Sequence, residues 1–376
     1  MTNIGKLRIQ KDGFKAFIPN SFPLKSGFGF SQKILRKNDE AVRLLGKLDG
    51  ITQLLPDIDF FLFMYIYKDA TSSSQIEGTN ATMMDALEAE AKIESDTPED
   101  VDDIIHYIKA LNYGMKRIEN FPFVLRFIRE LHKELMSSAR ATNHAYPGEF
   151  RKSQNWIGGT KLEDASFVPP PVDDMNRALG DLEKFINIQD DILPLIKAGL
   201  LHAQFETIHP FTDGNGRTGR MLVTFFLWKY EMLERPVLFL SSYFKKHKQT
   251  YYERLQGYHF GEVEKWMSFF LGGIIEIANE SILTVQKITK TREQDRLKIQ
   301  KLSTRASESA SILLPKLYKT PIVTVGNVEK ITGFTRAGAQ KIVDRFVKMK
   351  ILYPKKQPKK YAQSYVYKDY IEIFSE

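Results

Sequence analysis

The stretch HPFTDGNGRTGR, residues 209–220, places a histidine, a carboxylate, three glycines and two arginines between two apolar segments. Residues 192–208 before it and 217–232 after it have the apolar spacing of helices. The stretch therefore predicts two helices joined by a short turn, because its proline ends the first helix and its glycines let the chain fold back. Such a loop adds little to a core, so its polar residues indicate a binding site.

The turn has the composition of an anion site. Gly214 and Gly216 let the backbone form a concave row of N–H groups, and the N-terminus of the following helix adds the positive end of its dipole. Arg217 and Arg220 are three positions apart in the first turn of that helix, so both side chains project from one face. Together these residues predict a site that grips a polyphosphate.

Two further residues predict chemistry at this site. Asp213 offers the hard carboxylate oxygen that Mg²⁺ prefers, and Mg²⁺ commonly binds with phosphate oxygens and water completing its shell. His209 is the candidate general base, since an ordinary histidine pKa of about 6.5 leaves it mostly neutral at pH 7. A calcium loop of the EF-hand kind is excluded because its later ligand positions fall on Arg217 and Thr224. Nucleotide transfer is the chemistry these parts support, and a purely structural helix hairpin is the alternative.

Composition limits the class of protein. The chain has 376 residues, 43% hydrophobic and 27% charged, which predicts a soluble globular main domain with at least one smaller module. It has no cysteine, which excludes disulfides and thiolate chemistry and suits a reducing compartment. The most apolar segments, 60–67 and 221–230, are about half the length needed to cross a bilayer. We expect a cytoplasmic protein with no membrane contact.

The chain divides by pattern into five parts: an extended N-terminal segment 1–35, a helical region 36–120, a core 121–286, a linker 287–301 and a C-terminal module 302–376. The charged run 287–301 has few apolar anchors and is also compatible with an exposed helix. Between residues 146 and 171 the pattern changes to Gly-Gly and Pro-Pro punctuation with aromatic and β-branched residues, which predicts a small β-hairpin or flap. Further helical spacing covers 37–55, 57–70, 81–95, 98–119, 122–139, 172–188, 247–257 and 260–286.

The stretch 209–220 resembles the signature of the Fic family, His-x-Phe-x-Asp/Glu-Gly-Asn-Gly-Arg-x-x-Arg, at every fixed position. The resemblance implies a mostly helical Fic fold and an enzyme that moves the AMP of ATP onto a hydroxyl of a target protein, possible self-modification included. By resemblance, His209 deprotonates the hydroxyl and Asp213 holds Mg²⁺. The implied nucleotide-binding residues are Phe211, Gly214, Asn215, Gly216, Arg217 and Arg220, with Arg217 also counted as catalytic. Relatives that act as kinases have lysine at the position of Gly216, and this chain does not.

Three neighbouring segments extend the resemblance over roughly residues 35–285. GEFRKSQNWIGG, 148–159, followed by SFVPPP is similar to the flap that aligns a target segment by strand addition. YYERL, 251–255, resembles the lining of the adenine pocket, with Tyr252 the expected contact and a core role for both tyrosines the alternative. TSSSQIEGTN, 71–80, resembles the family's inhibitory helix motif, with the motif residues Ser73, Glu77 and Gly78. By resemblance, the glutamate pairs with Arg220 in place of the γ-phosphate.

The C-terminal module carries the basic charge of the chain. Residues 301–376 contain fifteen Lys and Arg against six Asp and Glu, a balance of +9, while the whole chain carries +8. Residues 324–352 give helix, turn and helix, which resembles a winged helix-turn-helix. Contact with DNA is one interpretation, and dimerisation or docking of a target is the other. The residues for DNA contact are Arg336, Gln340 and Lys341 in the groove and Lys355, Lys356, Lys359 and Lys360 on phosphates.

Two classes of function follow from the sequence. The first is a Mg²⁺-dependent protein adenylyltransferase restrained by its own Glu77, with ATP and a hydroxyl-bearing protein as substrates. The second is a DNA-binding or scaffold protein that only senses nucleotide. A variant of the first class removes AMP or transfers another phosphate-linked group. The sequence leaves open the target, the direction of reaction and whether the chain forms a homodimer.

Overall fold

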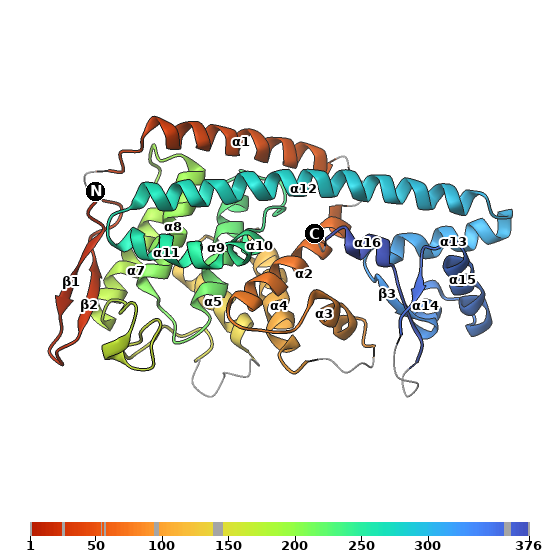
Figure 1. Cartoon of the computed structure of the whole chain (residues 1–376), viewed down its shortest axis with the longest axis horizontal. Helices are drawn as coiled ribbons and strands as arrows, with labels where there is room; N and C mark the ends of the chain where they lie inside the picture. Colours follow the sequence, from red (N-terminus) through yellow and green to blue (C-terminus); the bar gives the residue numbers. More distant parts are fainter. Residues whose placement is uncertain are drawn as a thin grey trace.

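The structure is a computed structural model that describes residues 2–24, 27–53, 55, 58–93, 98–137, 146–356 and 362–374. A helical body holds most of the chain, and a small β-hairpin lies at one end of it (Figure 1). The helix α12 (Val263–Gln300) runs along the body and continues to the C-terminal module at the other end (Figure 1). The predicted mostly α-helical fold is confirmed.

The helices of the body follow the predicted spacing closely. The N-terminal half contains α1 (Gln32–Gln53), α2 (Ile58–Ile76), α3 (Met83–Glu90), α4 (Val101–Ile118) and α5 (Leu125–Met136). The second half contains α7 (Val172–Asn187), α8 (Pro194–Ile208), α9 (Asn215–Lys229), α10 (Ser241–Lys246) and α11 (Lys248–His259). The short α10 was not predicted, because six residues are too few to show a helical period.

The pair α8 and α9 forms the centre of the body. Every residue of α8 from Leu195 to Ile208 is buried, so this helix has neighbours on all sides and no polar face. The ring of Trp266 on α12 donates to the carbonyl of Gly199 over 2.8 Å. On the α9 side, Phe225 packs edge-on against Phe127 of α5 with ring centroids 5.4 Å apart. These contacts hold the turn between α8 and α9 in a fixed place.

The linker interpretation of residues 287–301 is wrong, because α12 continues through Gln300 without a break. The charged run keeps a buried stripe that includes Ile288, Asp295 and Ile299. Asp295 accepts a hydrogen bond from the hydroxyl of Tyr367 in the C-terminal module. Among the described residues, α12 is the one helix long and apolar enough to cross a membrane, but 61% of its most apolar window is buried inside the protein. Its apolar residues therefore serve the core.

Strands appear where only an extended segment was expected. β1 (Gly5–Ile9) and β2 (Lys15–Pro19) pair antiparallel, with Gly5 opposite Pro19. The amide of Phe17 donates to the carbonyl of Val168 over 2.9 Å, which joins this hairpin to the predicted flap. The flap itself has one antiparallel bridge, Ile157 to Phe167, and a 3₁₀ turn at Leu162–Asp164. Together they form one small β region.

The C-terminal module contains the predicted helix, turn and helix. Its helices pack beside a three-stranded sheet of order β3-β5-β4. The turn contains Gly333, at φ 72°, and Thr335, whose hydroxyl accepts from the amide of Gly338 and caps the second helix. This arrangement agrees with the winged-helix interpretation, which stays a prediction. The elements are α13 (Thr304–Leu317), β3 (Ile322–Thr324), α14 (Val325–Thr332), α15 (Arg336–Lys348), β4 (Tyr353–Pro354), β5 (Ser364–Val366) and α16 (Lys368–Glu372).

The basic residues assigned to DNA are placed unevenly. Lys355 forms an ion pair with Glu88 of α3, a buried carboxylate, so it points toward the body and against the predicted phosphate contact. Gln340 donates to Asp344 on its own helix over 2.8 Å. Lys359 and Lys360 lie outside the described residues. DNA binding by this module remains a prediction.

The packing of α4 against α5 and α9 gives a stability test. A Cβ atom on Gly114 would lie 2.3 Å from the Phe225 ring and 2.6 Å from Leu131, whereas one on Gly180 in α7 would meet nothing within 4 Å. Gly114→Ala should lower the free energy of unfolding by about 1–3 kcal/mol through overpacking. Gly180→Ala should raise it by about 0.5–1 kcal/mol, since alanine favours a helix over glycine. Urea unfolding of the two variants measures both, and equal effects would contradict this packing.

Candidate active site

His209 ends α8 in the left-handed conformation, with φ 48° and ψ 60°. Its amide still donates to the carbonyl of Phe205 over 2.9 Å. Its carbonyl accepts from Nε of Arg151 over 3.0 Å, and the amide of Arg151 donates to Pro210. A side chain in this conformation costs about 1–2 kcal/mol, so the surrounding contacts must impose it. These contacts hold the imidazole of His209 at the turn between α8 and α9.

The imidazole of His209 is neutral. Burial and, to a smaller extent, the charge of Arg151 lower its pKa, Glu77 acts in the opposite direction, and the net pKa is about 4. Its Nδ1 is buried and has no hydrogen-bond partner among the described residues. A neutral imidazole is the form that accepts a proton, as predicted for a base. Negative charge from a bound phosphate would raise its pKa and make it a stronger base.

The side chains of Phe211 and Asn215 hold the turn together. Both ends of the Asn215 amide are used, because its Oδ1 accepts from the amide of Phe211 and its Nδ2 donates to the carbonyl of Phe211, each over 2.8 Å. Phe211 is fully buried and stacks on His132, with centroids 3.6 Å apart. Both side chains are buried inside the turn, and the part that Phe211 and Asn215 take in nucleotide binding stays a prediction. Their contacts fix the backbone of the turn.

His132 of α5 supports the same turn and was missed in the sequence. Its Nδ1 accepts from the amide of Gly148, so the proton resides on Nε2, which donates to the carbonyl of Asp213 over 2.9 Å. Burial lowers the pKa of His132 to about 4, so it stays neutral. Its only signal in the sequence was a histidine on the apolar face of a helix. Its partner across 81 residues of chain was not visible there.

Gly214 immediately precedes α9 at φ 76°, and its amide donates to Oδ1 of Asp213 over 2.6 Å. A Cβ atom there would lie 2.9 Å from Sδ of Met136, so only glycine fits. At Gly216 a Cβ atom would meet Oε1 of Glu77 at 2.4 Å. The two glycines therefore open space for an anionic group at the N-terminus of α9, and in this structure the carboxylate of Glu77 lies against that space.

Arg217 is buried but only loosely paired. Its guanidinium nitrogens lie 3.7 Å from carboxylate oxygens of Asp103 and Asp213, and its Nε has no partner among the described residues. The carboxylate of Asp213 is half exposed. No group of three His, Asp or Glu side chains that would hold a metal ion by itself occurs in the described ranges. The site thus fits Mg²⁺ only if a nucleotide supplies further oxygens, as Mg²⁺ sites often require.

Arg220 joins two distant parts of the chain. Its Nε donates to Oγ of Ser73 over 2.8 Å, and one terminal nitrogen donates to the Ser73 carbonyl over 3.0 Å and to Oε1 of Glu77 over 2.7 Å. Burial acts to raise the pKa of Glu77, but the charge and hydrogen bond of Arg220, together with the charges of Arg217 and His209, bring the net pKa below the ordinary value. Gly78 follows at φ 100° and ends α2. The pairing of the inhibitory motif with Arg220, expected from resemblance, is present in the structure.

The two neighbouring tyrosines of α11 differ. Tyr251 is 1% exposed, and its hydroxyl hydrogen-bonds Nε2 of His202 over 2.8 Å, so it belongs to the core. Tyr252 is 43% exposed and remains accessible to a nucleobase. The core interpretation therefore holds for the first tyrosine, and the predicted adenine contact is left to the second.

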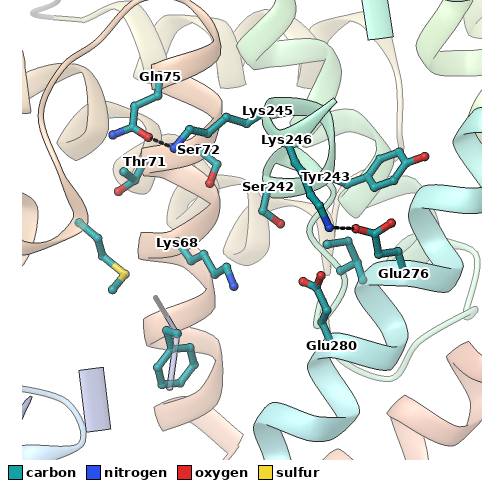
Figure 2. A pocket seen from close by; sticks show the side chains of 13 residues that line it. Lys68, Thr71, Ser72, Gln75, Ser242, Tyr243, Lys245, Lys246, Glu276 and Glu280 are labelled. Carbon is teal, nitrogen blue, oxygen red and sulfur yellow. Dashed lines mark hydrogen bonds and ion pairs between the residues drawn. The ribbon is translucent and has the colours of Figure 1, made fainter. Parts of the chain in front are cut away.

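The opposite face of α2 lines a cavity of about 440 Å³ shared with α10 and α12 (Figure 2). Lys245 of α10 reaches across to Oε1 of Gln75 over 2.5 Å, and Lys246 pairs with Glu276 of α12 over 2.6 Å. Oγ1 of Thr71, which also lines the cavity, has no partner among the described residues. One face of α2 is thus hydrogen-bonded through Ser73 to Arg220, and the opposite face borders the cavity.

Two models of one family cover the regions just described. The model for the Fic/DOC family N-terminal region matches residues 35–116, and the Fic/DOC family model matches residues 122–227. The chain belongs to the Fic/DOC family. The first match contains α2, Ser73 and Glu77, and the second contains His209 and Arg220.

Curated relatives of this Fic protein include two insect proteins, each named "Protein adenylyltransferase Fic". The one from Aedes aegypti is 30% identical over 167 residues, covering 43% of this chain and 30% of the relative. The one from Culex quinquefasciatus is 26% identical over 204 residues, covering 52% of this chain and 37% of the relative. The chain thus matches only about a third of the length of these relatives.

Solved structures show the same fold. A Fic family protein from Desulfovibrio desulfuricans has a TM-score of 0.55 at 17% identity, covering 90% of this chain and 97% of that one. Residues 134–508 of Fic-1 from C. elegans give a TM-score of 0.53 at 18% identity, covering 69% of this chain and 74% of that one. At such identities the likeness concerns the fold alone.

The two adjacent serines of α2 test the Arg220 site. Ser73→Ala leaves Nε of Arg220 buried without its hydroxyl partner, so the free energy of unfolding should fall by about 1–3 kcal/mol. Ser74→Ala is the matched control, because Ser74 is equally buried and its Oγ has no partner among the described residues. This variant should be neutral or slightly stabilising. Thermal unfolding compares them, and equal losses would contradict a specific role for Ser73.

Proposed function

We propose that this Fic protein is a protein adenylyltransferase that transfers AMP from ATP to a hydroxyl of a target protein. The observation that carries the proposal is a neutral His209 set beside the open N-terminus of α9, with Arg217 and Arg220 projecting from the same turn. Membership of the Fic family and the adenylyltransferase relatives support it. A nucleotide sensor would need the phosphate grip but no base, so His209 favours the enzyme.

Each group of the turn has one role in the proposed transfer reaction. His209 takes the proton of the target hydroxyl, whose oxygen forms a bond to the α-phosphorus of ATP. The bond to the bridging oxygen breaks, and pyrophosphate leaves. The backbone N–H groups of Asn215 and Gly216 and the two arginines face the place where negative charge grows on the phosphates. Mg²⁺ held by Asp213 and the phosphates would neutralise part of the same charge.

In this proposal, Glu77 restrains the activity. Its carboxylate occupies the side of Arg220 that would otherwise hold the γ-phosphate, and it lies against Gly216. The Glu77 side chain is 37% exposed, whereas that of Arg220 is buried. Adding a polyphosphate would bring like charges together around this one arginine, which is unfavourable. ATP then binds with its terminal phosphate displaced, and its α-phosphate is out of line with the target hydroxyl.

Replacing the base tests the chemistry. His209→Ala should abolish AMP transfer, a loss of at least about 100-fold, while ATP binding persists because the phosphate contacts remain. ATP labelled at the α-phosphorus should leave its label on protein with the wild-type base present. Autoradiography measures transfer and calorimetry measures binding. Transfer of label only from the γ-position would overturn the adenylyltransferase proposal.

Replacing the inhibitory carboxylate tests the restraint. Glu77→Gly removes both charge and bulk beside Arg220, so the rate of self-modification or target modification should rise at least about 10-fold. Arg220→Ala in the Glu77→Gly background should reverse the gain, because the same arginine serves both states. Gln75→Gly, on the opposite face of the same helical turn, is the matched control and should not activate. Equal rates for wild type and Glu77→Gly would refute autoinhibition.

A further inference from the structure

The C-terminal module contacts the body on both sides of the inhibitory segment, residues 73–78. Before this segment, the ring of Phe374 packs edge-on against Tyr65 of α2, with ring centroids 5.6 Å apart, and both side chains are buried. After it, Lys355, which directly follows β4, forms an ion pair with Glu88 of α3. In Figure 1, α3 lies between the body and the module. The segment is therefore bracketed by two contacts with the module.

The ion pair of Glu88 matters because its carboxylate is removed from water. Glu88 is 2% exposed, and Lys355 is the one cation that pairs with it among the described residues. The Lys355 side chain is 34% exposed, so its ammonium can return to solvent far more easily than the carboxylate can. An unpaired charge in a buried place is strongly unfavourable. Loss of Lys355 would therefore displace α3 or admit water beside it.

The rest of this interface is loose, as suits a contact that can open. Nδ2 of Asn327 donates to the carbonyl of Ala91 over 3.5 Å, which is long for a hydrogen bond. A cavity of about 680 Å³ separates α14 from the residues that follow α3. The module is anchored elsewhere, by the unbroken helix α12 and by the hydrogen bond from Tyr367 to Asp295. The contact with α3 can therefore break while the module stays on α12.

The turn between Glu77 and α3 is short and bonded to its surroundings. Its residues donate hydrogen bonds to Asp100 and Asp103 at the start of α4. A capping box of Thr82 and Asp85 begins α3 directly afterwards. The glutamate can therefore withdraw from its arginine only if this turn moves, together with the elements at its ends. One of those elements is α3, which the module holds.

We propose that the C-terminal module restrains the inhibitory segment, and that the ion pair between Lys355 and Glu88 transmits the restraint. The module holds α2 at Tyr65 and α3 beyond the turn, so Glu77 stays on Arg220. When Lys355 leaves Glu88, α3 moves more freely and Glu77 is more often away from its partner. The effect on AMP transfer rests on the proposed function, whereas the motion of the segment can be measured without catalysis.

The experiment breaks the ion pair from either side in the full chain. Lys355→Met keeps the aliphatic stem and removes the charge, and Glu88→Gln keeps the shape and leaves no unpaired charge inside. Each variant should raise the rate of AMP transfer by about 3- to 10-fold, because the inhibited state loses one stabilising contact. Lys348→Met is the matched control, since this lysine of the same module is exposed and takes part in no ion pair among the described residues. It should leave the rate unchanged.

Hydrogen exchange provides a measurement that needs no chemistry. In Lys355→Met and in Glu88→Gln, the amides of residues 71–80 and of α3 should exchange faster than in wild type, and those of the buried α8 should not change. A second background tests the route of the effect. In Glu77→Gly, Lys355→Met should add little to AMP transfer, because the restraint that it removes acts through Glu77.

Three results overturn this assignment. The first is unchanged exchange over residues 71–80 in both variants of the ion pair, so a failure of one variant to fold does not hide the answer. The second is activation by Lys348→Met as large as that by Lys355→Met. The third is the same activation by Lys355→Met with and without Glu77. Absence of AMP transfer in every variant, Glu77→Gly included, would instead overturn the proposed function, and hydrogen exchange alone would then decide whether the module restrains the segment.

Discussion

The buried guanidinium of Arg220 is the constraint on which the rest of the site depends. A cation removed from water must be matched by an anion and by hydrogen bonds, and here Ser73 and Glu77 supply both. Because those partners lie 143 to 147 residues away, the match fixes the end of α2 against the start of α9. Any group that replaced Glu77 at Arg220 would have to supply the same charge.

The turn that presents Arg220 is rigid for a different reason. Its backbone is held by the amide of Asn215, by the stacked pair Phe211 and His132, and by the guanidinium of Arg151. Burial keeps the nearby histidines neutral, so the site contains few cations other than its arginines. The positive field at the turn therefore comes mainly from Arg217, Arg220 and the N-terminus of α9.

Much of this organisation was predictable from local pattern. The two central helices were predicted because each has a helical apolar spacing over fifteen residues, and the proline and glycines between them mark where one ends and the next begins. The signature 209–220 gave the polar groups of the turn in order, because neighbours in a tight turn stay neighbours in space. The same logic failed for α10, which is six residues long, and for the charged end of α12, whose buried stripe is narrow. It also did not show that the side chains of Phe211 and Asn215 hold the turn together.

The sequence by itself determined the helical period, the glycines of the turn and the identity of the groups gathered there. Only the tertiary structure decided which distant groups meet. Examples are the hydrogen bond from His132 to the carbonyl of Asp213, the ion pair between Lys355 and Glu88, and the packing of Glu206 against Gly219. The physical reason is that periodicity and turn chemistry act over a few residues. Charge pairing and burial act through space, between segments whose approach is set by the packing of the whole body.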